Sequence, residues 1–405
     1  MAAIRPFRAL RPARDTAPSV SSVPYDVVST EEARQLAAGN PLSFLRVTRS
    51  EIDLPAAADP YGAAVYEKAR ENFAALRANA PLVVEEEPSL YFYRLRMGGH
   101  EQTGMAGTFS VDEYEQDIIK KHERTRRDKE DDRTRHMVEL RAQTGVVFLT
   151  YRASEAIDRL CRAVTADAPL YDFRADDGVH HTIWRVKPHE AAALVDAVGR
   201  IPALYIADGH HRAASAARAR TQLRARGDST EADTFIAVAF PDNQVHILPY
   251  NRTVKDLAGQ TPAAFLAALR TRVPVRDGVA TPRGKGEVAM YLDGKWHALD
   301  LSAASPADGS RASSLDVALL QQHVLEPVLH IGDVRSDNRI DFVGGARGTS
   351  ALEHAVMSGK AAVAFSMHPV TIDDLMSISD EGGIMPPKST WFEPKLRDGL
   401  LVHTI

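Results

Sequence analysis

Hydrophobic positions in the first quarter of the chain follow two spacings. Residues 61–79 carry apolar side chains at intervals of three and four, which is the period of an amphipathic helix. Residues 90–95 and 103–111 are rich in aromatic and β-branched residues and flank the turn Gly98-Gly99, so they predict two paired strands. This part of the sequence therefore mixes helix and sheet.

Prolines break up the apolar runs nearest the N-terminus. They cut the runs at residues 23–28 and 43–47, and because proline lacks an N–H and favours extended neighbours, these runs predict strands and loops. Between them, Ser29-Thr30-Glu31-Glu32 supplies a capping residue followed by early carboxylates. We expect a helix to begin there and to end before Gly39-Asn40-Pro41.

The middle of the chain alternates strands and helices. A buried strand at residues 204–207 leads directly into a glycine turn and an alanine-rich helix through Arg220, and this is the best defined unit of the sequence. The other expected elements are a strand at 146–151, a helix from Ser154, a strand pair within 171–186, a helix at 188–198, paired strands at 235–240 and 244–248, helices at 262–269 and 315–328, and a strand at 361–365.

These elements predict an α/β protein with mixed sheets. We expect an N-terminal α/β segment (residues 1–80), a central α/β region that holds the glycine turn (81–255) and a C-terminal α/β region with a proline- and lysine-rich loop (256–405). A single intertwined body with two lobes is the alternative arrangement.

The composition excludes several classes of protein. A formal net charge of -5 argues against bulk capture of nucleic acid, which needs a strongly basic surface. Cys161 is the only cysteine, which rules out an intramolecular disulfide and a zinc site built on paired thiolates. We find neither a secretory signal nor an apolar stretch of roughly 18 to 20 residues, so we expect a cytoplasmic protein without a membrane partner.

The glycine turn carries the clearest chemistry. In Asp208-Gly209-His210-His211-Arg212 the glycine allows a sharp turn, and the helix that follows offers N–H groups and the positive end of its dipole to an anion. Arg212 adds a bidentate donor, the two histidines can bind phosphate or move a proton, and Asp208 can hold a divalent cation. The alternative is that Asp208 caps the helix and the histidines are surface polar residues.

A charged run at residues 122–136 offers a second set of cations. If the run is helical, basic side chains at steps of three and four form a stripe suited to a polyphosphate: His122, Arg126, Lys129, Arg133 and His136. The alternative is a solvated helix face held by salt bridges.

Two further segments carry candidate substrate ligands. The stiff loop at residues 385–395 can place Lys388 and Ser389 on a ligand, or it can simply pack its aromatic residues on the core. Near the N-terminus, Ser43 is a candidate substrate ligand and Glu51 a candidate general base, although a surface glutamate is the simpler explanation.

With these motifs in order, the chain resembles the family known as domain of unknown function 1015. The matching segments are residues 6–10, 24–27, 40–45, 120–136, 207–212, 249–252 and 385–395. The sequence departs from the family pattern at Arg46, where histidine is usual, and at Gly383, where glutamate is usual. If either position touches substrate, specificity or activity would differ.

The Asp208 to Arg212 turn is also similar to the phosphate-binding turn of the ParB-like and sulfiredoxin-like group, which includes the free serine kinases. The resemblance implies a phosphate-binding core of that type within a larger two-lobed body. It also implies that the turn cradles the donor phosphates and that a glutamate activates the serine hydroxyl.

The sequence thus predicts a phosphotransferase that acts on a small hydroxylated metabolite, most simply free L-serine. The expected donor is ATP, ADP or pyrophosphate with Mg²⁺, and the lack of a Walker motif leaves the donor open. The rival hypotheses are a ParB-type nucleotide-binding switch and a phosphohydrolase that uses water as acceptor. Oligomeric state stays open.

Overall fold

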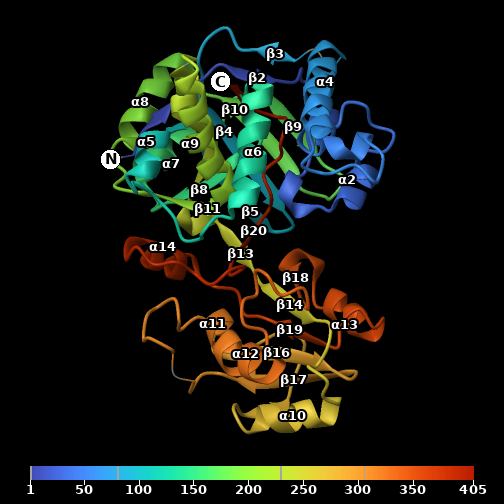
Figure 1. Cartoon of the computed structure of the whole chain (residues 1–405). Helices are drawn as coiled ribbons and strands as arrows, with labels where there is room; N and C mark the ends of the chain where they lie inside the picture. Colours follow the sequence, from blue (N-terminus) through green and yellow to red (C-terminus); the bar gives the residue numbers. More distant parts are fainter. Residues whose placement is uncertain (1, 80–81, 229, 305) are drawn as a thin grey trace. The chain divides into compact units, whose positions relative to one another are not determined.

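The computed structural model describes residues 2–79, 82–228, 230–304 and 306–405 (Figure 1). The chain forms two compact units, which we call the first unit (Met1–Val245 with Pro394–Ile405) and the second unit (His246–Glu393). The C-terminal residues therefore return to the first unit. The boundary expected between residues 80 and 81 lies outside the described residues, and the three predicted regions stay predictions.

The first unit contains both helices and strands. Its elements are β1 (Ile4–Arg5), β2 (Ala9–Arg11), α1 (Ala17–Val20), α2 (Thr30–Leu36), α3 (Leu45–Thr48), α4 (Ala63–Asn79), β3 (Val83–Val84), β4 (Tyr91–Met97), β5 (His100–Ser110), α5 (Val111–Glu115), β6 (Ile119–Lys120), α6 (Arg127–Leu140), β7 (Ala142–Gln143), β8 (Val147–Tyr151), α7 (Glu155–Val164), β9 (Tyr171–Arg174), β10 (His180–Arg185), α8 (Pro188–Val198), β11 (Leu204–Asp208), α9 (His210–Ala225), β12 (Thr234–Pro241) and β21 (Val402–Thr404). Short 3-10 helices cover Tyr25–Val27, Ser50–Asp53, Thr230–Asp233 and Asp242–Gln244.

The main sheet of the first unit has the strand order β6-β11-β8-β12-β5-β4-β10-β9, and β1 also pairs with β5. It is mixed: β8 runs parallel to β12 and antiparallel to β11. The mixed α/β class predicted from the sequence is thereby confirmed. A smaller sheet, β3-β2-β21-β7, joins the returning C-terminus to the N-terminal strands.

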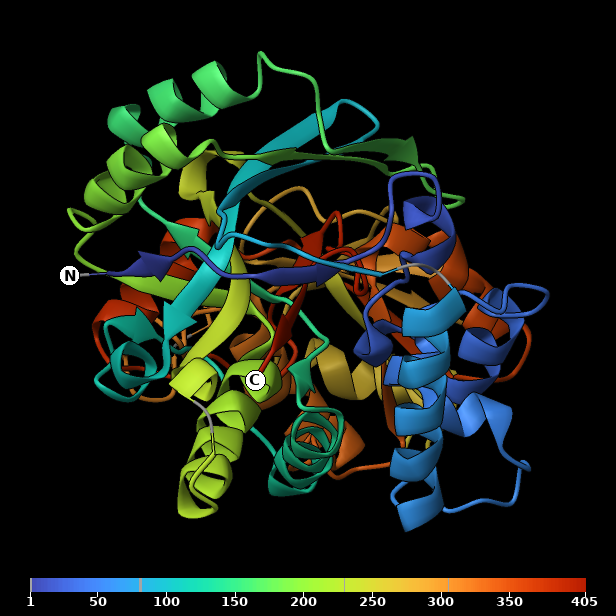
Figure 2. The same cartoon turned by 90° about the horizontal axis from the view of Figure 1, so that it is seen from above.

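One face of the main sheet carries the apolar core of the first unit. Strand residues such as Phe109, Leu149 and Phe235 pack there with side chains of α7, α8 and α9. Helices α7 and α8 lie side by side, and so do α6 and α9 (Figure 2). Alanines on the buried side of α9 allow this helix to pack closely on the sheet. Its first turn follows directly after the end of β11.

Local signals in the sequence explain several of these elements. Ser29 and Glu32 form the capping box that starts α2, with the side chain of each bonded to the backbone N–H of the other. The predicted hairpin is present as β4 and β5, which pair up to Met97 and His100 on either side of the glycine turn.

Two predictions for the N-terminal region were wrong. The runs at residues 23–28 and 43–47 contain no strand: Tyr25–Val27 is a 3-10 helix, and α3 covers Leu45–Thr48. Phe44 and Val47 are buried against Ala69 and Phe73 of α4. Packing on a neighbouring helix therefore outweighed the local preference for extended backbone.

The second unit is built on an antiparallel sheet with the order β15-β17-β16-β19-β14-β18. Its elements are β13 (His246–Leu248), β14 (Tyr250–Val254), α10 (Pro262–Arg270), β15 (Val275–Asp277), β16 (Glu287–Leu292), β17 (Lys295–Asp300), α11 (Asp316–Leu320), a π-helical segment (Gln321–Leu325), α12 (Glu326–Leu329), β18 (Ile340–Gly344), a 3-10 helix (Gly345–Arg347), α13 (Ser350–Met357), β19 (Val363–Ser366), α14 (Ile372–Asp380) and β20 (Trp391–Glu393). Helix α13 packs on this sheet over Tyr291 and Ala364.

One predicted strand pairing was also wrong. β12 and β13 were expected to pair across residues 241–243, but β12 lies between β5 and β8 and β13 pairs with β20. The 3-10 helix Asp242–Gln244 lies where the chain passes from the first unit to the second.

The predicted helix at 315–328 is present with a π-helical segment at its centre. Among the described residues, we find no helix with the length and hydrophobicity that crossing a membrane requires.

Candidate functional site

The glycine turn joins β11 to α9 as predicted. Gly209 has φ 97° and ψ 29°, in the left-handed region that residues with a Cβ rarely adopt. A Cβ at this position would also lie 3.3 Å from Cδ of Arg212 and 3.4 Å from Cα of Val147. The first N–H groups of α9 and the positive end of its dipole are directed toward this turn, as at any helix start, and the N-cap glycine has no side chain with which to cap them. Such a helix start favours an anion.

The two histidines of the turn hold a neighbouring segment in place. Nε2 of His210 accepts a hydrogen bond from the backbone N–H of His122 at 3.4 Å, and the two rings pack edge to face. Nε2 of His211 accepts a bond from the N–H of Arg126 at 3.0 Å. Burial lowers the pKa of His210 well below its usual value and that of His122 to about 4. His210 is therefore neutral and positions residues 122–126 against the start of α9.

Arg212 is buried and already has protein partners. Its Nη1 donates to the carbonyl of Val146 at 2.7 Å, and its Nη2 lies 2.7 Å from both carboxylate oxygens of Asp26. Burial alone would lower the pKa of Arg212, but Asp26, Asp208 and the other acidic groups around it raise that pKa well above its usual value. Its Nε has no hydrogen-bond partner among the described residues. Arg212, which the sequence predicted to bind phosphate, therefore already uses both Nη atoms in bonds within the protein.

Asp208 forms an ion pair at the end of β11. Its Oδ2 lies 3.1 Å from Nζ of Lys395, and the two side chains are 29% and 13% exposed. Burial raises the pKa of Asp208, but the positive charges of Lys395 and Arg212 lower it by more, so the net pKa lies below its usual value. The carboxylate is therefore ionised at neutral pH. Lys395 was missed as a site residue, although it lies in the loop from which Lys388 was chosen.

A buried carboxylate, that of Asp398, lies close to Arg212. Asp398 is 1% exposed and accepts hydrogen bonds from the backbone N–H groups of Val146 and Tyr25. Its Oδ2 has no hydrogen-bond partner among the described residues. Burial raises its pKa to about 7, although Arg212 opposes this rise. This aspartate could not be recognised from the sequence, because its neighbours Tyr25, Val146 and Arg212 come from three distant segments.

Tyr25 lies between two guanidinium groups. The guanidinium of Arg133, in α6, is 4.3 Å from the centre of the Tyr25 ring, and the guanidinium of Arg212, in α9, is 5.6 Å from it. Arg133 also pairs with Asp132 at 2.6 Å and donates to the carbonyl of Thr48. The ring thereby connects α6 to α9, and cation–π contacts of this kind stabilise by about 0.5–2 kcal/mol each.

The structure divides the predicted cationic stripe. Because α6 begins at Arg127, His122 and Arg126 precede the helix rather than continue its face. Arg126 pairs with Asp128 at 2.8 Å, and Lys129 donates to the hydroxyl of Tyr61 at 2.6 Å. His136 is buried, 3.0 Å from the carbonyl of Val47, and burial lowers its pKa to about 4.

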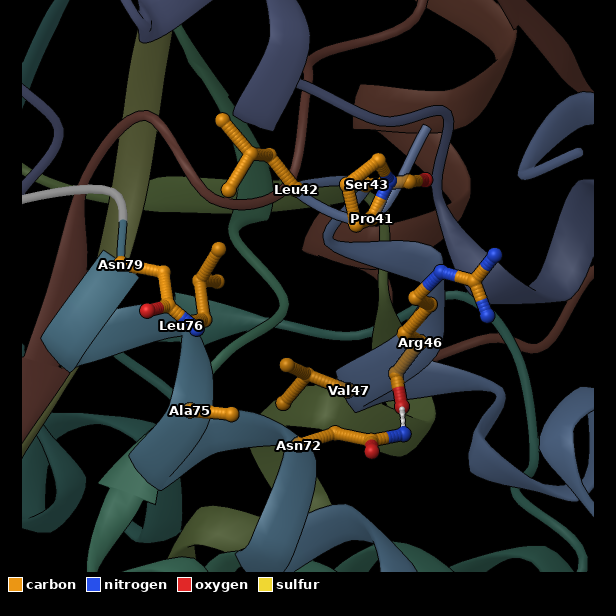
Figure 3. Close-up of a pocket in the computed structure, with 9 residues that line it drawn as sticks. All are labelled: Pro41, Leu42, Ser43, Arg46, Val47, Asn72, Ala75, Leu76 and Asn79. Carbon is orange, nitrogen blue, oxygen red and sulfur yellow. Dashed lines mark hydrogen bonds between the residues drawn. The ribbon is translucent and has the colours of Figure 1, made fainter. Parts of the chain in front are cut away.

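Ser43 lines a pocket of about 200 Å³ between α3 and α4 (Figure 3). Its hydroxyl lies 3.4 Å from that of Ser22. Arg46, one of the two positions predicted to depart from the family pattern, lines the same pocket, bonds the carbonyls of Ala37 and Asn40, and pairs with Asp53. The full lining is Pro41, Leu42, Ser43, Arg46, Val47, Asn72, Ala75, Leu76 and Asn79. The guanidinium of Arg46 therefore holds this loop together.

Glu51, the predicted base, lies in the 3-10 helix Ser50–Asp53. Its Oε1 is 3.0 Å from Nε of Arg49 and accepts a bond from the hydroxyl of Thr30 at 3.4 Å. The side chain is 13% exposed. Arg49 therefore holds the Glu51 carboxylate in a defined position. This geometry fits a general base and a purely structural residue equally.

Lys388 and Ser389 lie in the second unit. The Lys388 ammonium is 5.4 Å from the centre of the Tyr250 ring, and the Lys388 carbonyl accepts a bond from Arg252 at 3.0 Å. The Ser389 hydroxyl donates to the carbonyl of Pro386 at 2.6 Å. At Gly383, the other position predicted to depart from the family pattern, a Cβ would lie 3.1 Å from Cγ2 of Ile378.

Comparison with known proteins gives distant structural matches and one family. A free serine kinase in complex with AMP is 12% identical, with a TM-score of 0.37 over 73% of this chain and 91% of that one. SbnI with a C-terminal truncation, from Staphylococcus aureus, is 12% identical, with a TM-score of 0.40 over 72% of this chain and 85% of that one. A conserved hypothetical protein from Pyrococcus furiosus is 13% identical, with a TM-score of 0.37 over 73% and 94%.

No curated protein matches the chain. The profile of the family described as protein of unknown function (DUF1015) matches residues 4–318, which is more than half of the sequence. The chain therefore belongs to the DUF1015 family.

Proposed function

We propose that the protein is a phosphotransferase that phosphorylates the hydroxyl group of a small metabolite, most simply free L-serine. The observation that carries this proposal is the start of α9, where Gly209 exposes a helix N-terminus beside the ion pair of Asp208 and Lys395. Phosphoryl transfer depends on positioning and charge neutralisation more than on covalent chemistry by the protein. A helix N-terminus with an adjacent cation supports both requirements.

In the proposed reaction, the acceptor hydroxyl oxygen forms a bond to the transferred phosphorus while the bond from that phosphorus to the bridging donor oxygen breaks. ATP would leave as ADP, ADP as AMP, or pyrophosphate as phosphate. The hydroxyl proton passes to a carboxylate, for which we propose Glu51, while Asp208 holds the metal ion. We assign His210 a positioning role, because its buried ring already accepts a bond from the backbone of His122.

Magnesium is part of the proposal. Mg²⁺ is commonly held by one or two carboxylates together with substrate phosphates. Asp208 supplies one such carboxylate, and the described residues contain no group of three or more His, Cys, Asp or Glu side chains that would form a site made of protein ligands alone. When bound, the ion would neutralise part of the charge on the donor phosphates. Asp208 would hold it at the end of β11.

The donor phosphates would be bound at the first turn of α9. We propose Gly209, His211 and the Nε edge of Arg212 as contacts, joined by Arg126 and Lys129. The bond from the Arg126 N–H to His211 supports this grouping, because it ties the start of α6 to the turn.

Five of the predicted site residues remain to be assigned. Arg133 and His136 bond carbonyls of Thr48 and Val47, so we propose that they support the site rather than contact phosphate. For Ser43, Lys388 and Ser389 we keep the role predicted from the sequence, a contact with substrate, as a proposal. We place the reaction in the cytoplasm, with small-molecule partners and no nucleic acid.

Phosphorus NMR tests the proposal directly. Purified protein would receive Mg²⁺ and L-serine with ATP, ADP or pyrophosphate in parallel, and each donor would also be offered without serine. We expect a phosphoserine signal with one donor, its loss in Asp208→Asn, and its retention in Asp167→Asn, which alters an exposed carboxylate. Donor consumption without serine would instead indicate a phosphohydrolase. If no donor is consumed, the kinase proposal is wrong.

A further inference from the structure

The C-terminal segment brings a lysine to the start of α9. Lys395 is the second residue of the segment Pro394–Ile405, which belongs to the first unit although the second unit precedes it in the chain. Its ammonium lies 3.1 Å from Oδ2 of Asp208, the last residue of β11. The ammonium therefore lies next to the turn at Gly209.

The backbone that follows Lys395 is firmly held. Arg397 donates from Nε to Nε2 of the buried His181 at 3.2 Å and pairs with Asp177. The backbone of Asp398 pairs with that of Ser22 in both directions, at 3.1 Å and 2.9 Å. These anchors fix where the lysine stem begins, while its four-carbon chain lets the ammonium move by rotation.

The charges at this position require a cation if phosphate is to bind. The Asp208 carboxylate lies beside the first turn of α9, and without the Lys395 ammonium 3.1 Å away its charge would repel phosphate oxygens from the helix dipole. Lys395 cancels that repulsion. A lysine ammonium has three N–H donors, so its bond to Asp208 does not by itself exclude a bond to a phosphate oxygen.

We propose that Lys395 is a phosphate-binding residue of this site. Its ammonium neutralises Asp208 when no ligand is bound and contacts an oxygen of the diphosphate group when the donor is present. This inference deepens the proposed function and rests on it, because the ligand is taken to be the phosphoryl donor. A purely structural ion pair would instead affect stability and leave the affinity for phosphate unchanged.

Calorimetric titration with pyrophosphate tests this role on the full chain. We expect Lys395→Met to bind pyrophosphate about tenfold or more weakly than the wild type, as loss of a charge-assisted hydrogen bond implies. The matched control is Lys187→Met, which removes a lysine 2.6 Å from Asp167 at an exposed position, and it should bind as the wild type does. Wild-type affinity in Lys395→Met, or no binding by the wild type, would overturn the proposal.

A second measurement needs no substitution. The rate of acetylation of Lys395 in the wild type, followed by mass spectrometry, should fall several-fold when pyrophosphate is added, while that of Lys187 stays constant. An unchanged rate at Lys395 would contradict the proposal even if Lys395→Met does not fold. Lys395→Arg keeps the charge and should retain most of the affinity.

The outcomes separate this inference from the proposed function. If pyrophosphate protects Lys395 and Lys395→Met binds it weakly, but no acceptor is phosphorylated, Lys395 is a phosphate ligand and the kinase proposal fails. If phosphoserine forms at equal rates in the wild type and Lys395→Met, the kinase proposal stands and the role of Lys395 is refuted.

Discussion

Asp398 should make the stability of the protein depend on pH near neutrality. The substitution Asp398→Asn replaces the carboxylate by a neutral amide of the same shape. The amide oxygen can still accept the bonds that Asp398 accepts from the N–H groups of Val146 and Tyr25. The amide nitrogen would take the place of Oδ2, which has no hydrogen-bond partner among the described residues. The variant thus resembles the protonated form of the wild type.

The magnitude follows from the pKa of Asp398 in the folded protein. Burial raises that pKa from 3.8 to about 7, although Arg212 opposes the rise. The stability that the protonated carboxyl contributes is full below the pKa of the unfolded chain and is lost as the pH rises through the pKa of the folded state. A difference of this size corresponds to about 4 kcal/mol between pH 4 and pH 8.

Urea denaturation of the wild type and Asp398→Asn at pH 5, 6, 7 and 8 measures this effect. We expect the free energy of unfolding of the wild type to fall relative to the variant as the pH rises, with most of the loss between pH 5 and 7. Asp167→Asn, at an exposed position, controls for the general effect of removing a carboxylate. A difference between wild type and Asp398→Asn that stays constant from pH 5 to 8 would refute a pKa near 7.

Three further predictions concern the residues around the turn. Asp26→Asn should lower the free energy of unfolding by about 1–3 kcal/mol in urea denaturation, because it leaves the buried guanidinium of Arg212 without its carboxylate. The expected loss is smaller than for a fully buried pair because Asp26 is 37% exposed. No change would mean that water replaces the carboxylate. Gly209→Ala should cost about 1–2 kcal/mol and weaken pyrophosphate binding, whereas Gly227→Ala, with φ 75° and no atom near its Cβ, should show strain alone; equal binding by both variants would contradict this. In His211→Ala the amide hydrogen of Arg126 should exchange faster in hydrogen-exchange mass spectrometry, and unchanged protection would show that the bond at 3.0 Å is not what holds this segment.

The start of the candidate site was predictable because its signals are local. The apolar run at residues 204–207, the glycine two positions later and the alanine-rich helix each act over a few residues, so the sequence alone indicated a strand, a tight turn and a helix start. The capping box of Ser29 and Glu32 is local in the same sense. Propensity, capping and turn chemistry of this kind do not depend on distant parts of the chain.

The partners of that turn were decided by the tertiary structure. Asp26 reaches Arg212 across 186 positions of the sequence and Lys395 reaches Asp208 across 187, so neither ion pair has a signature in sequence spacing. The pairing of β13 with β20 likewise joins strands that lie more than a hundred residues apart in the chain, and a short apolar run does not specify its partner strand. The sequence by itself determined the strand, the glycine turn and the helix start at which we propose that an anion binds. Only the fold decided which charges surround that position, because ion pairing depends on distance in space rather than along the chain.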